Sequence, residues 1–171
     1  MIIREIELSD AEKLSALIQQ VEASSEYMLL GPGEREVDNE RQKNSIKRFK
    51  ESANSTLLVA ENDCNELVGY LVAIGGEVKR NQYTAYIVVG ISQQRRGQGI
   101  GTKLFEALDR WALVHGMHRL ELTVVTKNDA GLSLYKKMGF EIEGTKRDSL
   151  FIDHTFVDEY YMSKLIEPVL C

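Results

Sequence analysis

The spacing of apolar and polar residues predicts seven strands and four helices along the chain. Apolar residues at alternate positions indicate half-buried strands, and apolar residues three or four positions apart indicate helices that pack on a sheet. Strands are expected at residues 2–8, 56–61, 67–74, 82–91, 120–125, 141–152 and 155–165. Helices are expected to begin near Ala11, to surround Ile46, to follow the glycine cluster at 97–101 and to span 128–138.

Short polar or glycine-containing sequences mark several element boundaries. Ser9 and Glu12 have the spacing of a capping box, which favours a helix start at this point. The turn residues at 62–65 predict that the strands on either side of them pair as an antiparallel hairpin. Gly90 lies inside a predicted strand and indicates a bulge there. Residues 24–40 show no clear period and are expected to form a loop.

This order of elements predicts a single α+β domain over residues 1–171. Hairpins require antiparallel pairs, whereas a helix between two strands allows a parallel crossover, so the sheet is expected to be mixed and mostly antiparallel. Helices are expected on both faces, which gives three layers. A chain of 171 residues fits one ordinary domain and is short for two.

Composition and charge exclude several classes of protein. The chain has 43% hydrophobic and 27% charged residues, which is ordinary globular usage. Its net charge of −5 argues against nucleic acid or an anionic membrane as partner. The longest apolar stretch, 67–76, is about half as long as a membrane-spanning helix, and the charged residues at positions 4, 5 and 7 argue against a signal peptide. A cytoplasmic protein is expected.

Cysteine and histidine give no sign of a metal site or a disulfide. Cys64 and Cys171 are far apart and lack the spacing of metal ligands, and two free thiols fit a reducing compartment. His115 and His118 lie near a predicted helix end with no acidic third ligand nearby, so surface or capping roles are expected. The chemistry is therefore expected to use no metal.

The strongest chemical signal is the glycine-rich segment 91–102 between a strand and a helix. Gly97, Gly99 and Gly101 permit left-handed backbone and bring bare N–H groups close to a ligand. A helix start adds unpaired N–H donors and about half a positive charge, so the segment suits a phosphate group. Its spacing differs from both the dinucleotide fingerprint and the nucleotide phosphate loop. A tight turn with structural glycines is the alternative interpretation.

Gly99 and Gly101 lie three and five positions after Arg96, and Ile91 lies five positions before it. This pattern resembles the acetyl-coenzyme A motif of the GNAT superfamily of N-acetyltransferases. The resemblance implies an acyl-CoA N-acyltransferase fold in which amides of the turn bind the pyrophosphate. It also implies that the preceding strand opens from its neighbour and pairs with pantetheine. The residues so implied in cofactor binding are Val89, Gly90, Ile91, Arg96, Gly97, Gln98, Gly99, Ile100, Gly101 and Thr102.

A second segment, 128–140, carries the same resemblance. Asn128, Tyr135 and Phe140 stand at positions of the superfamily's next motif, with Gly131 in place of the usual alanine. The resemblance implies that Asn128 bonds the pantetheine arm and that Tyr135 protonates the leaving sulfur. Taken alone, Asn128 fits better as a helix N-cap and Tyr135 as a core aromatic. Both motifs in order, with a strand between them, favour the functional interpretation.

The base that deprotonates the amine is not fixed by these motifs. Some relatives carry a glutamate five residues before the motif asparagine, where this chain has Thr123. Glu34 is the foremost candidate. The full set of candidates is Glu26, Glu34, Glu36, Tyr83 and Tyr86. Residues 26–40 contain five acids and one base, Arg35, which favours a cationic amine; charges that only solvate a loop are the alternative.

Together these features predict an N-acetyltransferase that uses acetyl-CoA as cosubstrate. Direct transfer to a primary amine in a ternary complex is expected, because neither cysteine is placed as a nucleophile. A small cationic amine is the favoured acceptor, and a protein N-terminus or lysine is the alternative. A sensor that binds acyl-CoA without turnover is the alternative class. No nucleic acid or membrane partner is expected, and a homodimer through the C-terminal strands is a further expectation.

Overall fold

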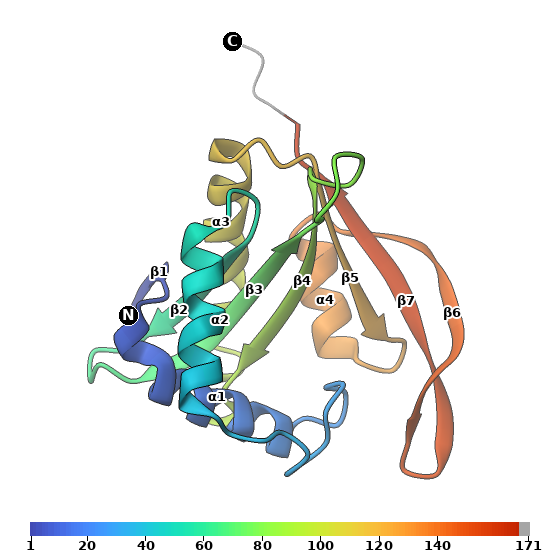
Figure 1. Ribbon diagram of the computed structural model, residues 1–171. Helices are drawn as coiled ribbons and strands as arrows, with labels where there is room; N and C mark the ends of the chain where they lie inside the picture. The colour runs from blue at the N-terminus through green and yellow to red at the C-terminus, as the bar shows by residue number, and fades with distance from the viewer. Residues whose placement is uncertain (168–171) are drawn as a thin grey trace.

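The computed structural model describes residues 1–167, which form seven strands and four α-helices (Figure 1). The strands are β1 (Ile2–Glu5), β2 (Thr56–Glu61), β3 (Leu67–Gly75), β4 (Thr84–Ile91), β5 (Arg119–Val125), β6 (Glu141–Ile152) and β7 (Thr155–Leu165). The helices are α1 (Ala11–Ser24), α2 (Asn39–Glu51), α3 (Ile100–Val114) and α4 (Asp129–Lys137). Two 3-10 turns, η1 (Leu8–Asp10) and η2 (Gln93–Arg95), lie before α1 and α3. Cys64 is exposed, and Cys171 lies outside the described residues.

All strands of the described chain lie in one sheet with the order β1-β2-β3-β4-β5-β7-β6. Among these strands of residues 1–167, only β4 and β5 run parallel, and every other neighbouring pair is antiparallel. The parallel pair is possible because α3 carries the chain from the end of β4 back to the start of β5. The predicted α+β class and the mixed, mostly antiparallel sheet are confirmed.

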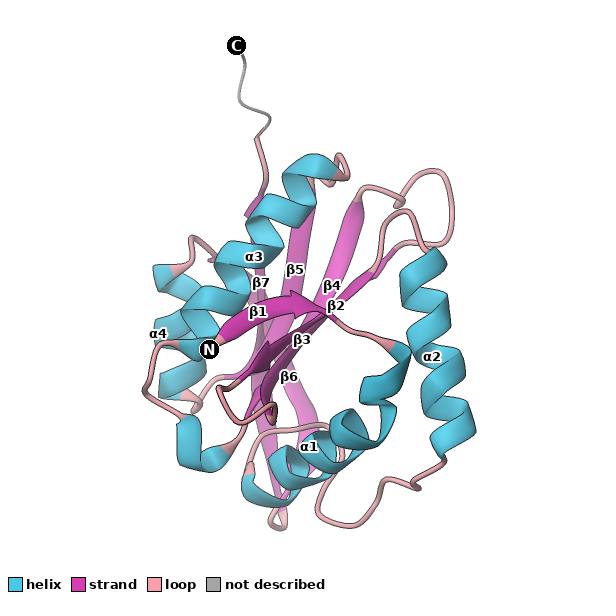
Figure 2. Cartoon of the chain, turned by 90° about the vertical axis from the view of Figure 1, so that its left-hand side faces the viewer, coloured by secondary structure: helices cyan, strands magenta, loops and turns pink. Residues whose placement is uncertain are grey.

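The helices cover both faces of the sheet, as predicted (Figure 2). On one face α3 buries Leu104, Phe105 and Leu108 against the central strands, and α4 packs beside it. On the other face α1 and α2 bury Leu14 and Ile46. Each buried Leu, Ile or Phe side chain contributes about 1.5–3 kcal/mol relative to an exposed one. These two cores fix the strands that carry the candidate site.

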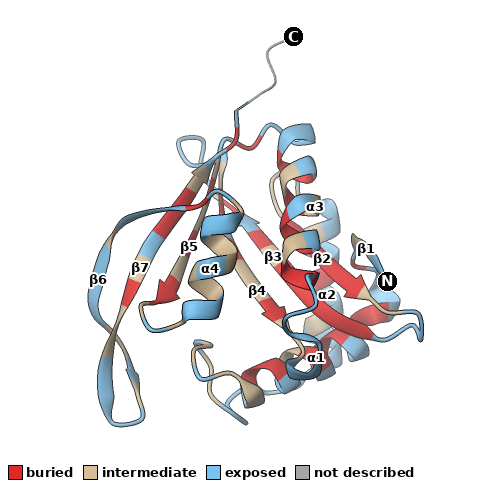
Figure 3. Cartoon of the chain, turned by 180° about the vertical axis from the view of Figure 1, so that it is seen from behind, coloured by how far each residue is buried: buried red, intermediate tan, exposed pale blue. Residues whose placement is uncertain are grey.

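The β6–β7 hairpin extends past the rest of the sheet and is largely exposed (Figure 3). Its two strands lose register between Ile142 and Gly144 and again between Lys146 and Leu150. Irregularities of this kind bend an edge strand and hinder further pairing along it. The expected homodimer through these strands stays a prediction.

The strands β4 and β5 are joined at one end only. Three residue pairs join them, of which the last is Tyr86–Glu121, and no further pair follows within residues 1–167. Beyond this point β4 continues to Ile91 along β3, and β5 continues to Val125 along β7. The two strands therefore diverge toward the glycine-rich turn (Figure 1).

Two expectations near the N-terminus are wrong. β1 ends at Glu5, and Leu8 belongs to η1, where it is exposed, so the alternation of Ile2, Ile6 and Leu8 does not mark a continuous strand. In place of the capping box predicted for residues 9 and 12, the structure has one between Glu7 and Asp10. In it the Asp10 carboxylate accepts the Glu7 N–H at 2.9 Å.

Gly90 does not form the predicted bulge. The pairing of β3 with β4 runs without a shift from Gly75–Ala85 to Gly69–Ile91, with Gly90 opposite Tyr70. A Cβ on Gly90 would lie 2.5 Å from Cε1 of Tyr70. Glycine is needed at this position because the Tyr70 ring crosses it.

Candidate active site

Two glycines of the turn hold left-handed backbone. The φ angle is +74° at Gly97 and +78° at Gly99, a region that costs an L-residue roughly 1–2 kcal/mol. A Cβ at either position would meet no atom of residues 1–167 within 4 Å, so backbone conformation, and not packing, explains these two glycines. Gly101 differs, because a Cβ there would lie 2.7 Å from Cδ2 of Leu134, and its absence lets α4 pack against the start of α3.

The main-chain N–H groups of residues 97–102 have no acceptor within residues 1–167. The next N–H, that of Lys103, bonds to the Gly99 carbonyl oxygen at 3.2 Å and begins the helical pattern. These free donors lie at the start of α3, a helix of 15 residues whose dipole places about half a positive charge there. The turn is thus a main-chain site able to bind an anion.

The side chains around the turn leave these N–H groups open. The Arg96 guanidinium donates to Ser24 Oγ of α1 at 3.2 Å, and the Gln98 amide donates back to a carbonyl of η2 at 3.2 Å. From α4, Lys137 Nζ donates to Thr102 Oγ1 at 3.2 Å. The last contact places a second cation beside Thr102 at the end of the turn, and the side chain of Ile100 is buried in the core.

β4 turns part of its main chain toward the opening between the strands. The N–H of Ser92 bonds to the Val68 carbonyl oxygen of β3 at 3.0 Å, and main-chain groups alternate sides along a strand. The main-chain groups of Val89 and Ile91 therefore face the opening, whereas those of Gly90 face β3. They lie beyond the last pair with β5, so they are available to an extended ligand.

Asn128 and Tyr135 lie at the two ends of α4. Asn128 Oδ1 accepts the Gly131 N–H at 3.0 Å, so Asn128 caps the helix. The Tyr135 ring packs edge-on against Phe105 with centroids 5.8 Å apart and lies 6.2 Å from the ring of Phe140. Both structural roles are thus present. They leave the Asn128 Nδ2 group and the Tyr135 hydroxyl with no partner among residues 1–167.

Hydroxyl groups gather where β4 and β5 separate. Burial, with a smaller contribution from Tyr86, raises the pKa of Tyr135 to about 12. At neutral pH the Tyr135 hydroxyl therefore keeps its proton and can donate it. Tyr86 of β4 and Thr123 of β5 face each other across the opening with their hydroxyl oxygens 2.8 Å apart. The sequence proposed Tyr86 only as a base candidate and missed its contact with Thr123.

Two acids of the loop between α1 and α2 accept hydrogen bonds from main-chain groups of the loop and of α2. Glu34 accepts a main-chain N–H of the loop at 3.1 Å, and Asp38 caps α2. Glu34 lines a hollow of about 370 Å³ with residues of α1 and α2, and no contact joins it to Tyr135 within the described chain. The loop itself approaches the opening, because the Tyr27 hydroxyl donates at 3.5 Å to a main-chain carbonyl just before α4.

An ion pair between this loop and α1 was also not predicted from the sequence. Arg35 donates to both carboxylate oxygens of Glu22 at 2.6 to 3.0 Å, and Glu22 is 3% exposed. Glu22 directly follows Val21, the last apolar residue of the predicted helical stripe, so it falls beside the buried face of α1. That position was a signal that an acidic residue needed a partner.

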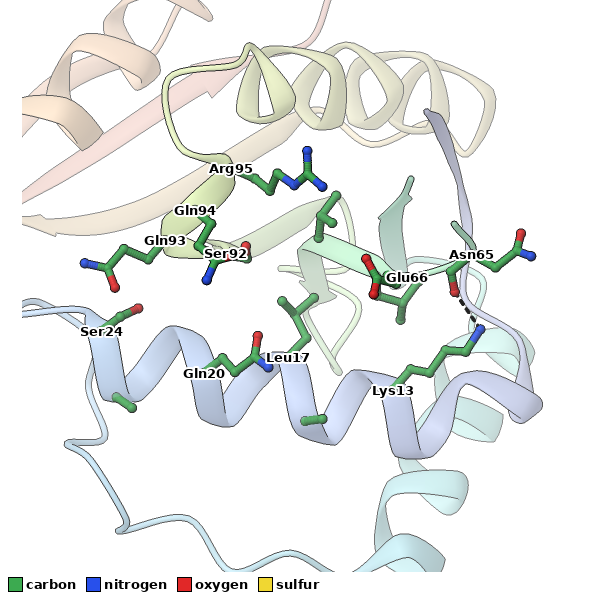
Figure 4. Close-up of a pocket in the computed structure, with 14 residues that line it drawn as sticks. Lys13, Leu17, Gln20, Ser24, Asn65, Glu66, Ser92, Gln93, Gln94 and Arg95 are labelled. Atoms are coloured by element: carbon green, nitrogen blue, oxygen red, sulfur yellow. Dashed lines mark hydrogen bonds between the residues drawn. The ribbon is translucent and has the colours of Figure 1, made fainter. Parts of the chain in front are cut away.

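A groove of about 570 Å³ borders the turn on the side of α1 (Figure 4). Its lining includes the apolar residues Leu17 and Val68, together with the polar side chains of η2 and of Lys13, whose Nζ donates to the Asn65 carbonyl at 2.8 Å. Neither Tyr135 nor the turn glycines line it. The groove is therefore separate from the opening between β4 and β5.

Neither a metal-ligand cluster nor a candidate membrane span is present within residues 1–167. No group of three or more His, Cys, Asp or Glu side chains is placed to hold a metal ion in this part of the chain. None of the helices in the same range is long and apolar enough to cross a membrane.

Comparison with known families and structures gives a consistent match. A family model described as the Acetyltransferase (GNAT) family matches residues 19–140. An acetyltransferase of the GNAT family from Streptococcus pneumoniae has a TM-score of 0.93 at 29% identity, over 97% of this chain and 99% of that one. The structure of yncA from Salmonella typhimurium with its cofactor acetyl-CoA has a TM-score of 0.87 at 18% identity, covers 100% of this chain and 96% of that one, and shows a shared fold.

Curated relatives match over part of their length. The L-amino acid N-acetyltransferase AaaT of Escherichia coli is 31% identical over 104 residues, which are 58% of this chain and 62% of the relative. The L-2,4-diaminobutyric acid acetyltransferase of Marinococcus halophilus is 28% identical over 114 residues, 66% of this chain and 64% of the relative. Each match thus spans less than two thirds of the relative.

Proposed function

Because the chain belongs to the Acetyltransferase (GNAT) family, we propose that it transfers the acetyl group of acetyl-CoA to a primary amine of a small molecule. The observation that carries the proposal is the row of free main-chain N–H groups at residues 97–102. They lie at the wide end of the opening between β4 and β5, and Tyr86 lies at its narrow end. A long ligand with a diphosphate at one end and a reactive thioester at the other suits this layout.

In this proposal the two ends of the cosubstrate have separate partners. The free amides, the dipole of α3 and Lys137 favour the pyrophosphate. The main-chain groups of Val89 and Ile91 and the Nδ2 group of Asn128 pair with the pantetheine arm. From Ile91 to Ile87, β4 extends about 13 Å at a rise of about 3.3 Å per residue, and this stretch leads from the turn to the hydroxyl groups.

The transfer is proposed as a direct reaction in a ternary complex. The amine nitrogen bonds to the acetyl carbon, a main-chain N–H of β4 stabilises the oxyanion, and the carbon–sulfur bond breaks. Tyr135 gives its proton to the departing sulfur, and the nitrogen loses a proton to a base or to water. A thiol with a pKa near 8.5 leaves readily, so the acid assists without being indispensable.

The proton on the amine is the harder part of the reaction. An amine with a pKa near 10.4 costs roughly 4–5 kcal/mol to neutralise at pH 7, whereas an α-amine near 8 costs only about 1–1.5 kcal/mol. Glu34 is proposed as the base, because the loop that carries it approaches the opening between β4 and β5. The surplus acids of that loop favour an acceptor that carries an ammonium group.

The acceptor is proposed to be a small amine. The two curated relatives are named for L-amino acids and for L-2,4-diaminobutyric acid, which are small amines of this kind. A cytoplasmic location, a homodimer and the absence of a nucleic acid or membrane partner stay predictions from the sequence.

Release of free thiol from acetyl-CoA tests the proposal directly. The enzyme is incubated with acetyl-CoA and a panel of amino acids, polyamines and basic peptides. Thiol release that depends on a small amine, with the acetylated amine seen by mass spectrometry, is expected. If only peptides support thiol release, the acceptor is a peptide or protein amine and not a small molecule. Tight cofactor binding without thiol release for any amine would identify an acyl-CoA sensor and refute the proposed enzymatic activity.

A further inference from the structure

Glu22 and Arg35 form an ion pair in which Glu22 is buried and Arg35 is partly exposed to solvent. The Glu22 carboxylate accepts its hydrogen bonds from Arg35 alone within residues 1–167. The Glu22 side chain is 4% exposed and that of Arg35 is 40% exposed. A buried carboxylate without a partner is costly, so Glu22 holds the guanidinium at a fixed place above it.

The ion pair lies near the end of α1 that adjoins the glycine-rich turn, because Ser24, two residues after Glu22, accepts a hydrogen bond from Arg96 at 3.2 Å. Burial is the main reason that the pKa of Tyr70 is raised to about 12; the charge of Glu22 acts in the same direction and the charge of Arg35 opposes it. The phenol lies over Gly90, where a Cβ would be 2.7 Å from its hydroxyl oxygen. Gly90 belongs to the stretch of β4 that borders the opening. Arg35 belongs to the loop that approaches the opening through Tyr27, on the face of the sheet that α1 covers.

Part of the Arg35 guanidinium is free to bind a ligand. Its Nε and Nη2 atoms hold Glu22, whereas Nη1 has no acceptor within the described chain. Arg35 lines the hollow of about 370 Å³ between α1, the loop and α2. A planar guanidinium held on one side by a carboxylate presents its remaining N–H groups in a fixed direction, which is the geometry that recognises a second carboxylate.

We propose that Arg35 binds the carboxylate of the acceptor, which is therefore an amino acid and not a plain amine. The inference rests on the proposed acetyl transfer and names the acceptor class of that site. Glu22 is the positioning residue, because it orients Arg35 and cancels much of its charge. The loop keeps a net charge of −4 with Arg35 included, so it favours the ammonium group of the same zwitterion.

The test compares amino acids with their own carboxamides, which keep the amine and side chain but lose the negative charge. Steady-state kinetics of thiol release give the ratio of kcat/KM for each acid to that for its amide. The variants are Arg35→Gln, Arg35→Lys and Glu22→Gln, with Arg48→Gln as the matched control. Arg48 is an exposed arginine of α2 that makes no ion pair within residues 1–167, so the control loses the same charge.

The acid-to-amide ratio is expected to fall at least tenfold in Arg35→Gln relative to Arg48→Gln, with the KM for acetyl-CoA unchanged. Arg35→Lys should restore part of the ratio, and Glu22→Gln should lower it while the arginine remains. If the Arg35 variants lower the melting temperature and leave the ratio as in the control, the ion pair only fastens the loop and the inference is wrong. Turnover of neither acids nor amides by the wild type would refute acetyl transfer itself, which is a different failure.

Discussion

Replacing Gly99 by alanine separates the backbone cost of the turn from its role in binding. Gly99 has φ of +78°, and a Cβ there would meet no atom of the described chain within 4 Å. Gly116, just past the end of α3, has φ of +67° and equally open surroundings. Gly116→Ala is therefore a matched control with the same strain, at the other end of the same helix.

The two variants should lose similar stability. An L-residue in the left-handed region costs about 1–2 kcal/mol. With an unfolding entropy near 2.1 cal/mol/K per residue, a 171-residue chain loses about 3 °C of melting temperature per kcal/mol, so each variant should melt about 3–6 °C lower than the wild type.

Only Gly99→Ala should weaken cofactor binding. Relief of the strain rotates φ and turns the N–H groups of residues 99 and 100 away from their common direction. Each hydrogen bond to a charged group contributes about 1.5–3 kcal/mol, so the loss of one raises the Kd of coenzyme A at least about tenfold.

Calorimetric titration with coenzyme A, alongside thermal unfolding of both variants, measures these quantities. Equal Kd values for Gly99→Ala and Gly116→Ala, with both proteins folded, would show that the turn amides do not hold the cofactor.

Three further predictions concern catalysis, the acceptor and pH. Tyr135→Phe should lower kcat about 10²-fold with little change in melting temperature, because the ring packing stays and only the hydroxyl is lost; an unaltered kcat would remove Tyr135 as the acid. Neutralising Glu34 and Glu36 together to glutamine should raise the KM for amines more than tenfold, and an unchanged KM would leave the loop acids as solvation only. Hydrogen bonds from Arg119 and Ser163 lower the pKa of Glu143 to about 2, so the stability from this carboxylate is present above its ordinary value near 4.5 and is lost as the pH falls toward 2. The destabilisation caused by Arg119→Met should therefore shrink between pH 5 and pH 2 in urea titrations, and a pH-independent difference would contradict this.

The sheet and its helices could be predicted because their signals are local. Apolar alternation marked β2, β3 and β5 to β7, and helical spacing marked α1 and α3. The same signal failed at residues 6–8, where Ile6 is buried and Leu8 is exposed in η1. Alternation of apolar residues alone cannot distinguish a continuous strand from a segment that leaves the sheet and turns after one buried apolar residue.

The parts of the site that depend on distant residues were not visible in the sequence. Gly90 looked like a bulge, because the Tyr70 ring that requires it lies on another strand. The Tyr86–Thr123 contact bridges two strands at the point where their pairing stops. Glycine spacing, by contrast, predicted a turn with exposed amides, because left-handed backbone and a helix start are properties of the segment itself.

A crystal structure of this protein with coenzyme A bound tests the central claim most directly. Several N–H groups of residues 97–102 should lie within hydrogen-bond distance of the diphosphate oxygens, with the thiol between β4 and β5 beside Tyr135. A diphosphate bound elsewhere, such as in the groove along α1, with these amides facing solvent, would contradict the account.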